Sequence, residues 1–101
     1  MAQFDQQRAE DGTAVVLAKG ELDLAVADEL ARVALEGLAS ASALSIDLHE
    51  ITFVDSTGLG SLLRIRNEAT AAGKALTLVG VPPALDRLLQ ITGLTDAFER
   101  R

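Results

Sequence analysis

The chain has 101 residues and a formal net charge of −6, with 49% apolar residues, 24% charged residues and no cysteine, tryptophan or tyrosine. This length predicts one domain over residues 1–101, while the acidic charge and the shortage of aromatic residues argue against binding to nucleic acid. The lack of cysteine excludes disulfides and thiolate chemistry, and no apolar run approaches the ~20 residues of a membrane span, so we expect a soluble, cytoplasmic protein that does not enter a membrane.

The first part of the chain predicts two strands. Residues 3–8 alternate weakly and suit an edge strand, and residues 10–13 form a turn signal. The run AVVLA, residues 14–18, is continuously apolar and β-branched, which is typical of a strand buried on both faces. Gly20 is expected to close this strand.

Residues 21–38 predict an amphipathic helix. Asp23 stands where an N-cap would stand, and Asp28 and Glu29 lie in the early turns, where the helix dipole favours acidic residues. Helical spacing predicts one buried face. The residues of this face are Leu24, Ala27, Leu30, Ala31, Ala34, Leu35 and Leu38.

The middle of the chain predicts a strand followed by a second helix. Residues 43–48 alternate, with Leu44, Ile46 and Leu48 on one face, and residues 49–54 bridge to the helix that begins at Ser56. Gly73 suits the left-handed position that ends such a helix. The face of the second helix is predicted to carry Gly58, Leu62, Ile65, Ala69 and Ala72, flanked by Leu59 and Leu63.

The last quarter predicts one more strand and a short helix. Residues 75–79 read as the strand, and the turn 80–83 leads into a helix that Gly93 stops. Phe98 is expected to dock on the core. The element order β-β-α-β-α-β-α predicts an α/β fold with a mixed central sheet of about four strands and helices packed mainly on one face.

The segment FVDSTGLG, residues 53–60, then lies between a strand end and a helix start, where open α/β sheets carry function. A serine nucleophile at Ser56 would need a small residue in place of Val54, and its base would have to be His49, the only histidine, seven residues away. A solvated His49 without catalytic function is the simpler interpretation.

Two other chemical readings of the segment are weak. The N–H groups of residues 56–58 suit an anion at a helix start, but the segment lacks the third glycine of a dinucleotide site and the Gly-Lys-Ser/Thr of a P-loop. Asp47, Glu50 and Asp55 would need to converge to hold a metal. We interpret them as solvated loop carboxylates.

Two readings are compatible with each other. Asp55 or Ser56 can cap the helix by accepting a backbone N–H. A serine exposed at a helix start is also accessible to a kinase, and phosphorylation would add about −1.5 to −2 charge. Because a docked partner would face that charge, the modification would act as a switch of an interface.

Several segments together resemble a known family. They are GELD at residues 20–23, the strand 44–48, the stretch TFVDSTGLG at residues 52–60, and TGL at residues 92–94 followed by Phe98. In this order they resemble the bacterial anti-sigma-factor antagonists, which are STAS-domain proteins, and the resemblance covers essentially the whole chain.

The resemblance implies a STAS fold over residues 1–101 and a non-catalytic interaction switch. The unphosphorylated form would bind an anti-sigma factor that is also a serine kinase, and so free the sigma factor. Phosphorylation of Ser56, with Thr57 as the fallback acceptor, would end binding, and a serine phosphatase would restore it. ATP and magnesium would come from the kinase, so no cofactor or metal of its own is implied. The implied partner-binding residues are Asp23, Asp55, Ser56, Thr57, Gly58 and Leu59.

Two alternatives stay open from the sequence. One is a STAS scaffold that is not phosphorylated, such as a regulatory subunit of a transporter or signalling assembly. The other, from a different class, is a small nucleotide-binding or hydrolytic protein. Family members often carry a longer C-terminal helix, so we expect the last element here to be short or absent, in a monomer or weak dimer.

Overall fold

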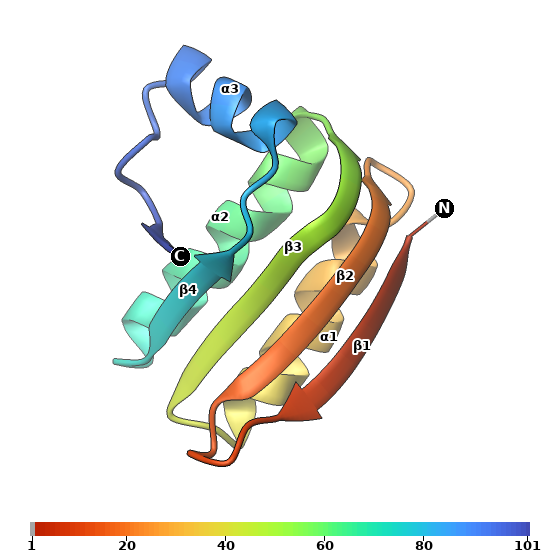
Figure 1. Cartoon of the computed structure of the whole chain (residues 1–101). Coiled ribbons are helices and arrows are strands. Elements are labelled where there is room, and N and C mark those ends of the chain that lie inside the picture. The colour runs from red at the N-terminus through yellow and green to blue at the C-terminus, as the bar shows by residue number, and fades with distance from the viewer. Residues whose placement is uncertain (1) are drawn as a thin grey trace.

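A mixed sheet and two long helices form the two layers of the structure, a computed structural model that describes residues 2–101 (Figure 1). Within these residues the sheet has five strands in the order β1-β2-β3-β4-β5. β1 pairs antiparallel with β2, and the other neighbours pair parallel. The strands are β1 (Gln3–Arg8), β2 (Ala14–Leu22), β3 (Ala43–Val54), β4 (Ala75–Val79) and β5 (Glu99–Arg100). The helices are α1 (Ala27–Ala39), α2 (Ser56–Ala71) and α3 (Pro83–Ile91).

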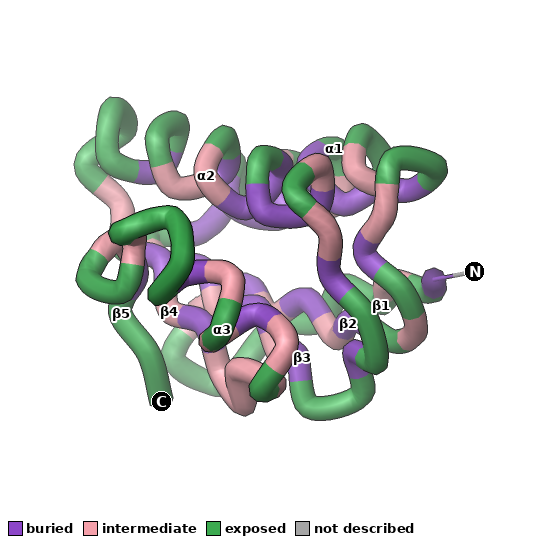
Figure 2. The backbone as a smooth tube through the Cα atoms, turned by 90° about the horizontal axis from the view of Figure 1, so that it is seen from above, coloured by how far each residue is buried: buried purple, intermediate pink, exposed green. Residues whose placement is uncertain are grey.

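The predicted α/β order is confirmed, and the core lies where α1 and α2 cover one face of the sheet (Figure 2). The predicted inward face of β3, formed by Leu44, Ile46 and Leu48, is fully buried there. α3 lies apart from the α1–α2 layer, at the end of the sheet, and buries Leu85 and Leu89. The carboxyl ends of β2 and β3 are therefore placed beside the start of α2.

The prediction that residues 14–18 are buried on both faces is wrong. Val16 is fully buried, but Val15 and Leu17 are only half-buried, because α1 and α2 cover a single face. The strand also continues through Gly20 to Leu22. Gly20 has a φ of +94°, and the pairing with β3 shifts register on both sides of it, so it marks an irregularity within the strand.

The start of the first helix also differs from the prediction. α1 begins at Ala27 with Val26 as its N-cap, and the Leu24 side chain is 77% exposed, outside the core. Asp23 stabilises the turn before the helix, where its Oδ1 accepts the Ala25 N–H at 3.1 Å. Ala72, assigned to the buried face of the second helix, is the exposed C-cap of α2.

The sheet has one strand more than the four expected. Glu99 and Arg100 form β5, which extends the sheet beside β4. Phe98, just before it, is buried as predicted. The last element is thus a short strand, and the segment 49–54, expected as a bridge, belongs to β3.

Candidate functional site

The end of β2 and the start of α2 meet in close contact. The Asp55 N–H donates to the Leu22 carbonyl oxygen at 3.2 Å. Gly58 lies against the same residue: a Cβ on Gly58 would stand 2.9 Å from the Leu22 Cβ and overlap its carbonyl oxygen. A side chain at position 58 would push α2 away from β2, which explains the glycine here.

Asp55 is the N-cap of α2. Its extended backbone lets Oδ1 accept the N–H groups of Thr57 and Gly58, each at 3.0 Å, and the Thr57 hydroxyl at 2.5 Å. The hydrogen bond from the Thr57 side chain, followed by the backbone N–H groups of Gly58 and Thr57, holds the pKa of Asp55 below its ordinary value. Of the two predicted capping residues, Asp55 therefore does the capping.

The two hydroxyls after Asp55 are in different situations. Ser56 is the first residue of α2, its side chain is exposed, and no hydrogen bond of its hydroxyl is found within residues 2–101. Thr57 is half-buried, and its hydroxyl is held by Asp55. Of the two predicted acceptors, only Ser56 presents a hydroxyl that is both exposed and unengaged.

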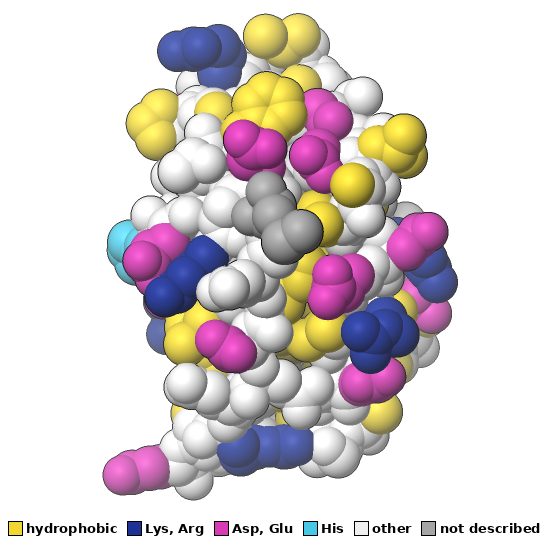
Figure 3. All heavy atoms as spheres, turned by 90° about the vertical axis from the view of Figure 1, so that its right-hand side faces the viewer, with side chains coloured by type: hydrophobic (Ala, Val, Ile, Leu, Met, Phe, Trp, Pro, Cys, Tyr) yellow, Lys and Arg dark blue, Asp and Glu magenta, His cyan; other side chains and the backbone are white. Residues whose placement is uncertain are grey.

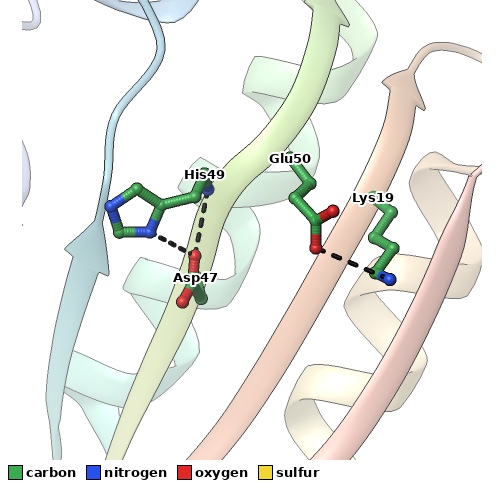
Figure 4. A network of polar contacts seen from close by, with 4 residues as sticks. All are labelled: Lys19, Asp47, His49 and Glu50. Atoms are coloured by element: carbon green, nitrogen blue, oxygen red, sulfur yellow. Dashed lines mark hydrogen bonds and ion pairs between the residues drawn. The ribbon is translucent and has the colours of Figure 1, made fainter.

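The catalytic reading of Ser56 does not fit this arrangement. His49 lies on β3, five residues before the strand ends at Val54. About 16 Å of extended chain therefore separates His49 from the end of the strand, where the Ser56 segment begins. Its Nδ1 pairs with Asp47 at 2.8 Å (Figure 4). Burial raises the pKa of Asp47, but hydrogen bonds from the His49 N–H and imidazole outweigh it and lower that pKa.

The three carboxylates considered as metal ligands are engaged separately. Asp47 contacts His49 and Glu50 pairs with Lys19 at 3.5 Å (Figure 4). Asp55 caps α2. Within residues 2–101 no group of three potential ligands is close enough to hold a metal ion. A bound phosphate at the α2 start is also disfavoured, because Asp55 already occupies the N–H groups of Thr57 and Gly58.

Comparison with known proteins identifies the family. The family model described as "Mlab, STAS domain" matches residues 6–99. The chain belongs to the STAS domain family. The sequence thus carries the STAS resemblance over nearly its whole length, with the Asp55–Ser56 segment at the α2 start inside the match.

Among relatives of this STAS domain, an anti-sigma-B factor antagonist of Staphylococcus aureus is 32% identical over 78 residues, 76% of the chain and 72% of the relative. One of Listeria monocytogenes is 41% identical over 56 residues, which cover 55% of the chain and about half, 49%, of the relative. An anti-sigma factor antagonist structure from Mycobacterium paratuberculosis has a TM-score of 0.85 at 28% identity, covering 99% of this chain and 85% of that one. Unphosphorylated SpoIIAA has a TM-score of 0.80 at 20% identity, covering 98% and 88%, which shows the fold alone.

The STAS domain places the predicted partner-binding residues together at one end, but not all of them at the surface. Asp23 and Asp55 are half-buried and Ser56 is exposed. Gly58 and Leu59 are buried, and Leu59 is only 4% exposed, because this side of α2 packs on the core. These two residues can shape the surface, but neither the buried Gly58 nor the Leu59 side chain can contact a docked protein.

Two exposed apolar residues at this end were missed from the sequence. Leu24 follows Asp23, and Phe53, 46% exposed, precedes the end of β3. The same end of the molecule, uppermost in Figure 3, shows hydrophobic side chains among acidic ones. Within the described residues 2–101, no helix is both long and apolar enough for a membrane crossing.

Proposed function

We propose that this STAS domain is an anti-sigma-factor antagonist whose unphosphorylated form binds an anti-sigma factor serine kinase and so frees the sigma factor. The observation that carries the proposal is the state of Ser56 at the start of α2, an exposed serine whose hydroxyl makes no hydrogen bond within residues 2–101. The names of the Staphylococcus and Listeria relatives support it. The chain itself is non-catalytic in this proposal, and the kinase supplies ATP and magnesium.

Phosphorylation of Ser56 switches binding off through charge. A phosphate adds about −1.5 to −2 charge at neutral pH. It cannot take the Thr57 and Gly58 N–H groups, because Asp55 holds both at 3.0 Å. The phosphate therefore stays at the surface beside a carboxylate, where a docked kinase would have to desolvate it. A serine phosphatase reverses the switch.

The acceptor is tested by incubating the chain with each anti-sigma-factor kinase of the source organism and ATP–magnesium, followed by intact-mass measurement. We expect one added phosphate on the wild type and none on Ser56→Ala. Ser42→Ala removes an exposed serine from the turn between α1 and β3, and we expect it to be modified like the wild type. Phosphate retained on Ser56→Ala would place the acceptor elsewhere.

The switch is tested by the affinity of substituted chains for the same kinases. We expect Ser56→Glu to weaken binding strongly and Ser42→Glu to leave it unchanged. Kinase binding without any phosphorylation of the wild type would favour the alternative of a STAS scaffold, in which Ser56 only forms part of the surface.

A further inference from the structure

A groove runs between the first halves of α1 and α2, directly beside the proposed phosphorylation site. Its walls include Leu24, Ala27 and Asp28 on one side and Thr57, Gly60 and Ser61 on the other. The volume is about 310 Å³, at the lower end of the roughly 300–1,000 Å³ of ligand pockets. We call this feature the α1–α2 groove.

Small residues create the groove. The Ser61 hydroxyl donates to the Ala27 carbonyl oxygen at 2.7 Å, which ties the two helices together. Ala27 and Gly60 then leave a hollow between the helix backbones. A Cβ added at Gly60 would meet no atom within 4 Å, so the space above this glycine is open.

Apart from Asp28, the polar side chains that line the groove already have partners within residues 2–101. The Ser61 hydroxyl is bound to Ala27, the Thr57 hydroxyl to Asp55, and Arg64 at the groove's end pairs with Glu68 at 3.6 Å. A small polar ligand needs a few free groups that converge on it. The groove offers apolar walls in their place, which suit an apolar side chain.

The α1 side of the groove is acidic, whereas the α2 side carries Arg64, which pairs with Glu68. Four carboxylates lie in the segment 21–29, and no ion pair involves them within residues 2–101. The segment contains no lysine or arginine. The four carboxylates are Glu21, Asp23, Asp28 and Glu29. Only Asp28 lines the groove, whereas Asp23 and Glu29 line a separate hollow beside Ala25 and Val26. A protein surface that covers the groove therefore gains from basic residues next to its apolar contact.

We infer that the α1–α2 groove receives an apolar side chain of the partner kinase, flanked by a lysine or arginine that pairs with Asp28. This inference rests on the proposed function, because the groove is continuous with the Ser56 surface through Thr57. Leu24, 77% exposed at the groove, adds apolar contact area. The groove would supply affinity, and Ser56 would control whether that affinity is available.

The decisive variant fills the groove from inside. Gly60→Leu places an apolar side chain in the open space, whereas Gly60→Ala adds only one methyl group at the same position. With the purified anti-sigma-factor kinases as probes, we expect Gly60→Leu to weaken binding about tenfold or more and Gly60→Ala to bind within about twofold of the wild type. Circular dichroism must show both variants folded, and an unfolded Gly60→Leu is replaced by Gly60→Gln with the same expectation.

The charge of the partner is tested separately. We expect Asp28→Asn to slow association at low salt, with the difference shrinking at high salt. Asp96→Asn removes an exposed carboxylate that does not line the groove, and we expect it to leave association unchanged. A slowing of equal size in both variants would show a general effect of net charge and overturn the pairing with Asp28.

The two proposals fail in different ways. If Gly60→Leu binds as tightly as the wild type while Ser56→Glu does not bind, the groove proposal is wrong and the switch stands. If no anti-sigma-factor kinase binds the wild type, the proposed function and the groove proposal are both wrong.

Discussion

The Leu22 carbonyl oxygen accepts the Asp55 N–H at 3.2 Å and so joins the last residue of β2 to the N-cap of α2. The turn that carries Asp23 follows directly from Leu22, and Ser56 follows directly from Asp55. One backbone contact therefore sets the position of both segments of the proposed surface. The stability of this junction decides how Ser56 is presented.

Gly58→Ala is expected to destabilise the fold. The new Cβ would overlap the Leu22 carbonyl oxygen, which is backbone and cannot swing away. We expect a loss of about 1–3 kcal/mol in the free energy of unfolding, measured by urea denaturation. Gly60→Ala is the matched control in the same helix, where open space predicts a gain of about 0.5–1 kcal/mol. Equal stability of the two alanine variants would contradict the close contact.

Asp55→Asn is expected to change the pH dependence of stability. Hydrogen bonds hold the pKa of Asp55 below its ordinary value in the folded chain, so the ionised form favours folding. This contribution is present above the ordinary pKa and is lost as the pH falls through the lower pKa of the folded state. We therefore expect wild type and Asp55→Asn to differ at neutral pH and to converge below about pH 4 in denaturation experiments. A difference independent of pH would contradict this role of the carboxylate.

Gly80→Ala is expected to be destabilising in a way that depends on His49. Gly80 has a φ of +67°, and an added Cβ would stand 2.5 Å from atoms of the His49 ring. The backbone strain remains in any background, but the clash disappears in His49→Ala. A double-mutant cycle should therefore show that Gly80→Ala costs less in the His49→Ala chain. Strictly additive effects would indicate that the ring moves aside without cost.

Leu24→Ser is expected to leave the fold intact. Because Leu24 is 77% exposed, we expect the substitution to change the free energy of unfolding by no more than about 0.5 kcal/mol. Leu30→Ala, at a fully buried position of α1, should cost about 2–5 kcal/mol. If Leu24→Ser matched the loss at position 30, Leu24 would belong to the core, as helical spacing alone suggests.

The order of elements could be predicted because periodicity and glycine positions are local signals. The alternation of Leu44, Ile46 and Leu48 and the turn at Gly73 depend on a few neighbouring residues, and the structure confirms them. Burial on one face or two depends on which helices return to the sheet. That is why Val15 and Leu17 were assigned to a buried face that does not exist.

The ends of the strands were harder to predict than their centres. Pairing between β2 and β3 shifts register around Gly20, so counting in twos from Leu48 no longer identifies the inward face. Ile51 and Val54 are buried there, while Phe53 is exposed. β5 has two residues and forms only through its pairing with β4, so it leaves no periodic signal.

The segment around Ser56 was predictable as a site, but its internal arrangement was not. The motif placed Asp55, Ser56 and Thr57 at a helix start. In the structure the Thr57 hydroxyl is held by Asp55, while the Ser56 hydroxyl has no hydrogen bond within residues 2–101, and the motif alone does not distinguish the two. Helical spacing placed Leu59 beside the buried face of the second helix, whereas the resemblance assigned it to the partner surface, and Leu59 is buried.

The central claim is tested most directly by titrating one anti-sigma-factor kinase with the unmodified chain and with the chain phosphorylated at Ser56, using isothermal titration calorimetry. The account predicts that the unmodified chain binds and that phosphorylation weakens binding at least about tenfold, which is about 1.4 kcal/mol. Circular dichroism should show the same fold in both forms. Equal affinities of the two folded forms would contradict the account.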